Sequence, residues 1–177
     1  MGRLFKNGTG SLCFFLFLFS LIQVNGQDYW FAGAGGSLEL SEELWGVNFR
    51  GYYGPNEVLC FGPEVSIFPY QEISEDEELS LIDLNINAHY VFEIAHGLGL
   101  YPIGGVNYSI ENTRGTIPTN TEAVRISALG LNYGAGLHFN LNKVFLYAEY
   151  KGIISELSAP FITAGVIFDL SKNESEH

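Results

Sequence analysis

From Gln27 onward, apolar side chains recur at every second position over stretches of about ten residues. The clearest stretch runs from Leu79 to Tyr90, where isoleucines and leucines at even positions alternate with Asp83, Asn85 and Asn87. Side chains with a period of two lie on opposite faces of a β-strand. Each such strand therefore has one apolar face and one polar face, and no stretch of this part of the chain shows helical periodicity with caps.

Eight stretches follow this pattern, and the links between them alternate in character. Short, turn-like links (54–57, 92–97 and 140–143) alternate with links that are longer or more charged (40–43, 70–78, 111–124 and 154–158). Outer-membrane barrels have short periplasmic turns and longer external loops. The pattern predicts an all-β fold, a closed antiparallel up-and-down β-barrel of about eight transmembrane strands, at about residues 29–39, 44–53, 58–69, 79–91, 98–110, 125–139, 144–153 and 159–170.

The composition of the two faces favours a membrane barrel over a soluble one. The polar face is also rich in glycine, which suits the crowded interior of an eight-stranded barrel. Aromatic residues gather near strand ends on the apolar face, as membrane-interface girdles require. Alternation alone leaves open the inverted arrangement, a soluble barrel with its apolar face inside. Three prolines, Pro63, Pro102 and Pro160, cannot donate to a strand ladder and are expected at bulges or strand ends.

The first 26 residues have the composition of a secretory signal peptide. Arg3 and Lys6 precede an apolar stretch that is too short to span a bilayer as a helix. We expect a signal peptide at 1–26, the barrel at 27–170 and a short polar tail at 171–177. Removal of the signal leaves six basic and 20 acidic residues, a formal charge of −14, which excludes a nucleic-acid partner.

Seven ionisable residues fall on the polar face and are expected inside the barrel. Buried charges must be paired or hydrogen-bonded, so we expect them to form a polar network that plugs the lumen. A narrow path for water or ions is the alternative. The predicted lumen residues are Arg50, Glu64, Asp83, His89, His138, Glu149 and Lys151.

The densest run of charge is predicted to form an acidic external loop. It contains Glu72, Glu75, Asp76, Glu77 and Glu78. Carboxylates are good ligands for divalent cations. One hypothesis is that the loop shares such cations with anionic lipopolysaccharide; the alternative is a solvated acidic loop.

Two segments carry a resemblance to a known family. The strand Thr163–Leu170 resembles the C-terminal signal by which the barrel-assembly machinery recognises outer-membrane barrels, with Gly165, Phe168 and Leu170 at its characteristic positions. Residues 132–140, followed by 144–150, are similar to the penultimate hairpin of small barrels of the OmpX type, within the outer-membrane protein β-barrel domain family. The resemblance implies location in the outer membrane, contact with its lipid and lipopolysaccharide, and a structural or surface-interaction role.

No catalytic constellation is recognisable. Outer-membrane deacylases place a histidine two residues before a serine, and none of His89, His96 and His138 fits that spacing. We therefore predict no catalytic residue, cofactor or metal, and a non-enzymatic protein whose extracellular partner the sequence does not identify. Two alternatives stay open: a lipid-modifying enzyme on the same barrel, and a soluble periplasmic or secreted barrel that binds an apolar ligand.

Overall fold

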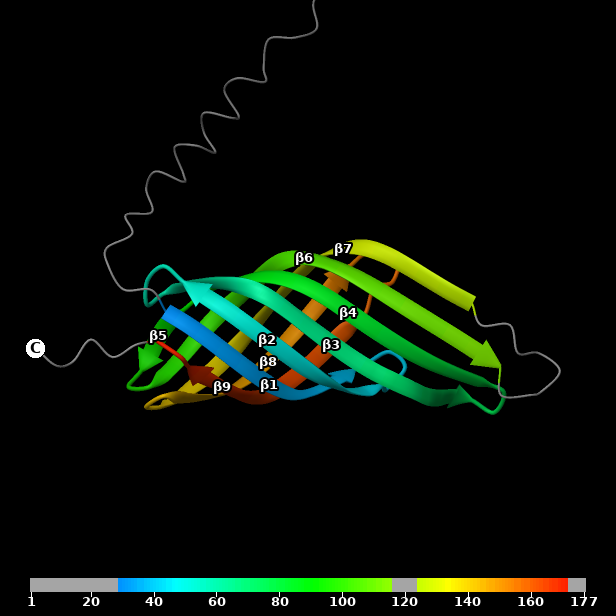
Figure 1. Cartoon of the computed structure of the whole chain (residues 1–177), viewed down its shortest axis with the longest axis horizontal. Coiled ribbons are helices and arrows are strands. Elements are labelled where there is room, and N and C mark those ends of the chain that lie inside the picture. The colour runs from blue at the N-terminus through cyan, green and yellow to red at the C-terminus, as the bar shows by residue number, and fades with distance from the viewer. Residues whose placement is uncertain (1–28, 116–123, 172–177) are drawn as a thin grey trace, which may run out of the picture.

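The computed structural model describes residues 29–115 and 124–171 as strands joined by turns (Figure 1). These residues contain no helix long and apolar enough to cross a membrane. The strands are β1 (Tyr29–Glu39), β2 (Trp45–Gly54), β3 (Leu59–Ser74), β4 (Glu77–Tyr90), β5 (Phe92–Ala95), β6 (Leu98–Gly115), β7 (Val124–Leu141), β8 (Val144–Ile154) and β9 (Pro160–Asp169).

The sheet closes on itself because β1 pairs with β9 as well as with β2. All pairings are antiparallel, and β4 also pairs directly with β6. The short β5 pairs with β6 beyond the end of β4, so β4 and β5 together act as one strand. The nine labelled segments therefore form an eight-stranded barrel. The predicted fold class is confirmed. A backbone bond from the Leu170 N–H to the Trp30 carbonyl (2.7 Å) extends the closing seam beyond the last strand.

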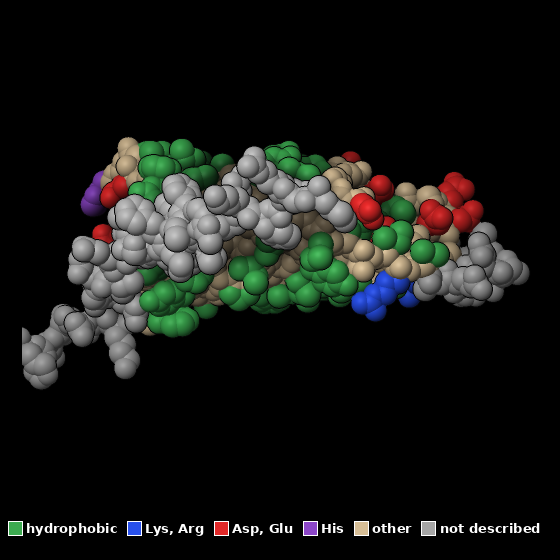
Figure 2. Space-filling model, turned by 90° about the horizontal axis from the view of Figure 1, so that it is seen from above, with side chains coloured by type: hydrophobic (Ala, Val, Ile, Leu, Met, Phe, Trp, Pro, Cys, Tyr) green, Lys and Arg blue, Asp and Glu red, His purple; other side chains and the backbone are tan. Residues whose placement is uncertain are grey.

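The alternation of the sequence becomes an inside and an outside of the barrel. Charged and amide side chains at alternate positions are buried inside, whereas leucines, isoleucines and aromatic residues at the intervening positions are exposed on the outer surface. Figure 2 shows these apolar side chains over the middle and left of the barrel, with acidic residues gathered at its right end. An apolar outer band over a polar interior is the arrangement that lipid requires.

All three prolines occupy positions where the ladder does not need their missing amide proton. The β2–β3 register has a gap that includes Pro63. Pro102 lies on β6 between the last pair with β4 and the first pair with β5, so the break between those two strands falls at this proline. Pro160 is the first residue of β9. These placements agree with the general restriction of proline to strand ends and irregular positions.

One end of the barrel carries the longer strands. At this end, which we call the loop end, β3, β4, β6 and β7 continue past the ends of β1, β2, β8 and β9 and form a protruding sheet of four strands, seen at the right of Figure 1. The opposite end carries the short turns and both ends of the described barrel, and we call it the turn end. The unequal ends match the short periplasmic turns and long external loops of outer-membrane barrels.

The protruding sheet corrects two predicted boundaries. The expected acidic loop is a tight hairpin instead: Glu72 lies in β3, Glu77 and Glu78 lie in β4, and only Glu75 and Asp76 form the turn. Ser74 pairs with Glu77, so the ladder runs to the tip. The predicted link 92–97 is likewise mostly strand, because β5 occupies residues 92–95.

Candidate functional site in the barrel lumen

The middle of the lumen is occupied by a central polar cluster built around two carboxylates and two cations. The Arg50 guanidinium donates both terminal nitrogens to Glu149, at 2.6 and 2.9 Å, and its Nε donates to Asn48 at 2.8 Å. The Tyr101 hydroxyl donates to the same Glu149 carboxylate at 2.8 Å. The guanidinium also lies 4.0 Å from the centre of the Tyr147 ring. This two-pronged pairing fixes the orientation of the arginine as well as its charge.

Glu64 is the second centre of the cluster and joins four strands. Its carboxylate accepts from Lys151 Nζ at 3.2 Å and from Asn87 Nδ2 at 2.6 Å, and also from the Tyr52 hydroxyl. Arg50 approaches it at 3.7 Å. The two buried cations therefore meet two buried carboxylates, so the charge of this cluster is balanced.

A group of amides lies on the wall formed by β4, β6 and β7. Asn132 donates to Asn85 and Asn87 at 2.9 and 2.6 Å, and Asn107 donates to Asn85 at 2.9 Å. Asp83 belongs to this group: it accepts from Ser109 and Asn107, and no Lys or Arg among the described residues lies within ion-pair distance of it.

Towards the loop end, the lumen changes from polar to apolar. Leu44, Phe68 and Phe161 are only 1–2 % exposed, and the two rings lie 5.8 Å apart. They form an apolar cluster together with Leu79, Leu81 and Ile153. Side chains of β3, β4, β8 and β9 and of the β1–β2 loop thus meet above the central polar cluster.

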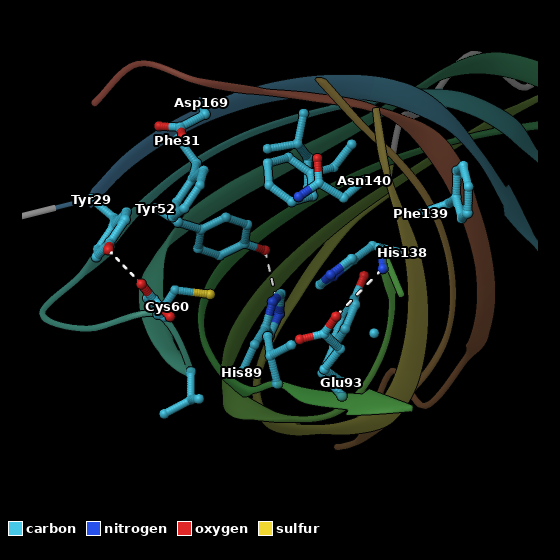
Figure 3. A pocket seen from close by; sticks show the side chains of 18 of the residues that line it. Tyr29, Phe31, Tyr52, Cys60, His89, Glu93, His138, Phe139, Asn140 and Asp169 are labelled. Carbon is cyan, nitrogen blue, oxygen red and sulfur yellow. Dashed lines mark hydrogen bonds between the residues drawn. The ribbon is translucent and has the colours of Figure 1, made fainter. Parts of the chain in front are cut away.

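Towards the turn end, the lumen opens into a cavity of about 650 Å³ (Figure 3). Tyr52, His89 and Tyr101 line its inner part, where Tyr52 and Tyr101 also contact the central polar cluster. Cys60 of β3 lines the wall as a free thiol. The lumen therefore has three layers between its ends: an apolar cluster, a polar cluster and an open cavity.

The seven predicted lumen residues do not all lie in one group. Arg50, Glu64, Glu149 and Lys151 lie together in the central polar cluster, and the His89 Nε2 lies 3.4 Å from the Tyr52 hydroxyl at its edge. Asp83 lies apart among the amides. The expectation that His138 joins the network is wrong, because this side chain is half-buried in the turn-end cavity and stacks on Tyr101.

Sequence reasoning missed the aromatic partners of the network. Tyr52, Tyr101 and Tyr147 are nearly fully buried inside the barrel and contact its carboxylates or its arginine. Their signal was positional: Tyr52 follows Arg50 by two residues, and Tyr101 follows Gly99 by two, so each lies on the inward face. Aromatic residues near strand ends were predicted to form girdles on the lipid face, and no tyrosine was included in the predicted lumen network.

The other predicted site residues lie at the two ends. The acidic residues form the hairpin of the protruding sheet, where Glu78 pairs with Arg114 at 2.6 Å. In β9, Phe168 is exposed on the outer surface and Gly165 lies against the β1 backbone; Leu170, just beyond the strand, is exposed. Within residues 29–115 and 124–171, no three His, Cys, Asp or Glu side chains are placed to hold a metal ion.

A closed antiparallel barrel with an apolar outer band, a polar interior and unequal ends defines an integral β-barrel protein of the outer membrane. Residues 19–167 match the outer membrane protein beta-barrel domain, and the chain belongs to that family. The protein is therefore an outer-membrane protein. The predicted signal peptide at 1–26 and residues 172–177 of the predicted tail lie outside the described residues.

Solved structures share the fold at low sequence identity. The attachment invasion locus protein Ail of Yersinia pestis is 19 % identical with a TM-score of 0.58, over 82 % of this chain and 99 % of that one; Ail has also been solved with the heparin analogue sucrose octasulfate. A major outer membrane protein from Thermus thermophilus is 11 % identical with a TM-score of 0.63, over 82 % of this chain and 100 % of that one. The N-terminal barrel domain of Pseudomonas aeruginosa OprF is 18 % identical with a TM-score of 0.55, over 81 % and 98 %. No curated protein sequence matches the chain.

Proposed function

We propose that the protein is a non-enzymatic outer-membrane barrel that presents its protruding sheet as an interaction surface outside the cell. The observation that carries this proposal is a free strand edge on that sheet. The pairing of β7 with β8 begins at Leu131, so residues 124–129 of β7 pair with β6 on one side and with no strand of the described residues on the other. Unpaired edges accept an extended peptide as an additional strand.

The two edges of the protruding sheet differ, and the difference favours the β7 edge. On the β3 side, the Gln71 side chain accepts from the Trp45 N–H and donates to the Trp45 carbonyl, both at 2.9 Å. The Gln71 side-chain amide thus makes the two hydrogen bonds that the backbone of a neighbouring strand would make. The β7 edge has no such cover among the described residues, and it carries three exposed apolar side chains: Val124 (55 %), Ile126 (45 %) and Leu129 (78 %).

The chemistry of the loop end argues for a peptide partner rather than a polyanion. The protruding hairpin of β3 and β4 carries Glu72, Glu75, Asp76, Glu77 and Glu78. Polysulfated ligands require a basic surface, so the heparin analogue bound by Ail is not transferred to this chain. Main-chain hydrogen bonds and apolar side-chain contacts at the β7 edge supply recognition without positive charge.

The experiment is a selection of random dodecapeptides on the immobilised, folded protein. Peptides that bind the wild type are expected to lose binding to Ile126→Lys, because an edge lysine opposes strand addition. Asn112→Lys on β6 is the matched control, since β6 is flanked by strands on both sides. Peptides that bind Ile126→Lys as well as the wild type, or a selection that yields no binder, would overturn the proposed edge.

We propose further that the lumen does not conduct. This is supported by the apolar cluster and the central polar cluster, which together contain most of the buried side chains of the barrel. Open channels are found in barrels of about 16 strands, whereas side chains fill the interior of small ones. Single-channel recording in planar bilayers tests the proposal: we expect no current steps, and resolved steps from the purified wild type would contradict it.

The remaining partners are proposed from the family and the surface. The outer apolar band is proposed to contact outer-membrane lipid, and the C-terminal segment that contains Phe168 and Leu170 is proposed to be recognised by the barrel-assembly machinery. The acidic hairpin is proposed to lie close to lipopolysaccharide headgroups and to share divalent cations with them. Membrane association that is equal in low and high calcium, before and after neutralisation of the hairpin carboxylates, would remove the cation-sharing role.

A further inference from the structure

The cavity at the turn end is walled by aromatic rings that follow one another around the inside of the barrel. Tyr52 of β2 contacts His89 of β4, with ring centres 4.7 Å apart, and His89 stacks on Tyr101 of β6 at 4.9 Å. Tyr101 stacks in turn on His138 of β7 at 5.7 Å. The rings come from four different strands that closure brings together, so they form a continuous aromatic wall.

The wall continues through the strands on the other side of the barrel. His138 meets Phe145 of β8 edge-on at 5.3 Å, and Phe145 meets Phe31 of β1 edge-on at 5.9 Å. The two remaining strands, β3 and β9, contribute Cys60 and Ile167 to the same cavity. We call the six rings from Tyr52 to Phe31 the aromatic collar; Figure 3 shows several of them around the opening.

The side chains at this cavity that are formally charged at neutral pH are all acidic. Glu57, Glu93 and Asp169 line it, and Figure 3 shows Glu93 and Asp169 on opposite sides of the opening. None of the described residues that line it is Lys or Arg. The balanced polar cluster beyond the inner end supplies no compensating positive charge. A ligand that fits this environment is positive and has an apolar surface.

We propose that the turn-end cavity is a binding site for a small organic cation with an apolar body, such as a quaternary ammonium or an aromatic amine. A cation positioned over aromatic faces is attracted by the ring quadrupoles. The carboxylates at the opening add longer-range attraction and disfavour anions. The volume of about 650 Å³ lies within the range of about 300–1,000 Å³ that is usual for small-molecule sites. In an outer-membrane barrel, the short turns face the periplasm, so the site would be filled from that side.

The test compares three probes that share a benzene ring and differ in charge: benzyltrimethylammonium, benzyl alcohol and benzenesulfonate. The folded protein is kept in an uncharged maltoside detergent, because a phosphocholine headgroup would itself carry a quaternary ammonium. The readout is the rate at which methyl methanethiosulfonate labels Cys60, followed by mass spectrometry of the peptide that contains it. Cys60 lines the cavity, so a bound probe shields its thiol.

The expected result is saturable protection of Cys60 by benzyltrimethylammonium, weaker protection by benzyl alcohol and none by benzenesulfonate. The double variant Glu57→Gln, Glu93→Gln should raise the half-saturating concentration of the cation by about threefold or more, the effect expected of exposed charges. Its control, Glu72→Gln, Glu77→Gln, makes the same charge change at the loop end and should leave the concentration unchanged.

A second pair of variants tests the collar. Phe145→Leu removes a collar ring and should weaken protection by about threefold to thirtyfold. Tyr150→Leu, on the outer face of the same strand, should leave protection unchanged. Equal protection by the cation and the sulfonate, or no protection by the cation, overturns the proposal. A folded barrel migrates differently on a denaturing gel before and after boiling. If a variant lacks this difference, it is not folded, and the charge preference of the wild type alone tests the proposal.

Discussion

Single buried carboxylates link several strands of this barrel through hydrogen bonds and ion pairs. Glu64 on β3 accepts from Tyr52, Asn87 and Lys151, which belong to β2, β4 and β8. Its side chain is about 1 % exposed, so water does not replace a lost partner. Removal of one member of a buried ion pair leaves an uncompensated charge in a poorly hydrated interior. The residues of the central polar cluster are therefore expected to respond to mutation far more strongly than surface ion pairs.

The first prediction contrasts two glutamates. Glu64→Gln leaves Lys151 without its carboxylate and should lower the free energy of unfolding by about 3–5 kcal/mol. Glu78→Gln breaks the Arg114 pair, in which Arg114 is 47 % exposed, and should cost less than about 1 kcal/mol. Guanidinium-induced unfolding in detergent measures both. The double variant Glu64→Gln, Lys151→Met should recover much of the loss; equal costs for the two single variants would show that the buried pair is not a strong contact.

The second prediction uses two adjacent glycines of β6 that face opposite ways. A Cβ at Gly104 would meet nothing within 4 Å, whereas a Cβ at Gly105 would lie 2.2 Å from Asn87 Oδ1 and 2.3 Å from the Ile86 carbonyl oxygen. Gly104→Ala should therefore leave stability unchanged or slightly raised. Gly105→Ala should cost about 1–3 kcal/mol, as overpacking does. The midpoints of denaturant unfolding decide, and similar midpoints for the two variants would contradict the close approach at Gly105.

At the scale of strands, the alternation of the sequence is a reliable guide inside the lipid band and a weaker one beyond it. The predicted bounds of the first strand, 29–39, agree with the structure, although residues 32–36 are an unbroken run of glycine and alanine that shows no alternation. The predicted ends at 69 and 110 are too early. Residues 111–115 carry polar side chains on both faces, so alternation stops while the ladder continues. A strand surrounded by water needs no apolar face to keep its hydrogen bonds.

The lumen was predictable in kind but not in detail. The alternation of side chains between the two faces of a strand predicted that Arg50, Asp83 and Glu149 point inward, and all three are buried in the structure. Which of them meet depends on the stagger between strands, and no local signal gives that quantity. Arg50 and Glu149 are 99 residues apart in sequence, and they meet only because β1 and β9 close the barrel. The rings of the aromatic collar likewise meet only because of the stagger between strands and the closure of the barrel.

The third prediction concerns the covered edge of the protruding sheet. Gln71→Ala removes the side chain that accepts from the Trp45 N–H and should expose that amide to solvent. The loss of one hydrogen bond, about 1 kcal/mol, corresponds to exchange about fivefold faster at Trp45. Amide exchange followed by NMR measures the change, with the amide of Phe49, which is paired with both β1 and β3, as the internal control. An unchanged rate at Trp45 would mean that the edge is protected by other contacts.

At the scale of the molecule, the barrel is asymmetric along its axis in chemistry as well as in length. Its loop end has a protruding sheet with an acidic hairpin and an apolar cluster that fills the lumen. Its turn end has a cavity with aromatic walls and acidic residues at its opening. The central polar cluster lies between the two ends. Because we propose that the lumen does not conduct, we expect the two proposed sites to act as separate surfaces of one barrel.

The last prediction concerns ion flow through the lumen. We expect the apolar cluster and the central polar cluster each to block ions without the other. Phe68→Ala with Phe161→Ala thins the apolar cluster, and Arg50→Ala with Glu149→Ala removes the two-pronged ion pair. Either pair of substitutions alone leaves the other layer in place and should give no current steps in planar bilayers. All four together should produce small, resolved steps, because an ion then meets a hydrated path from the cavity to the loop end. Current through the Phe68→Ala, Phe161→Ala variant alone would show that the polar cluster is permeable and that the apolar cluster is the only closure.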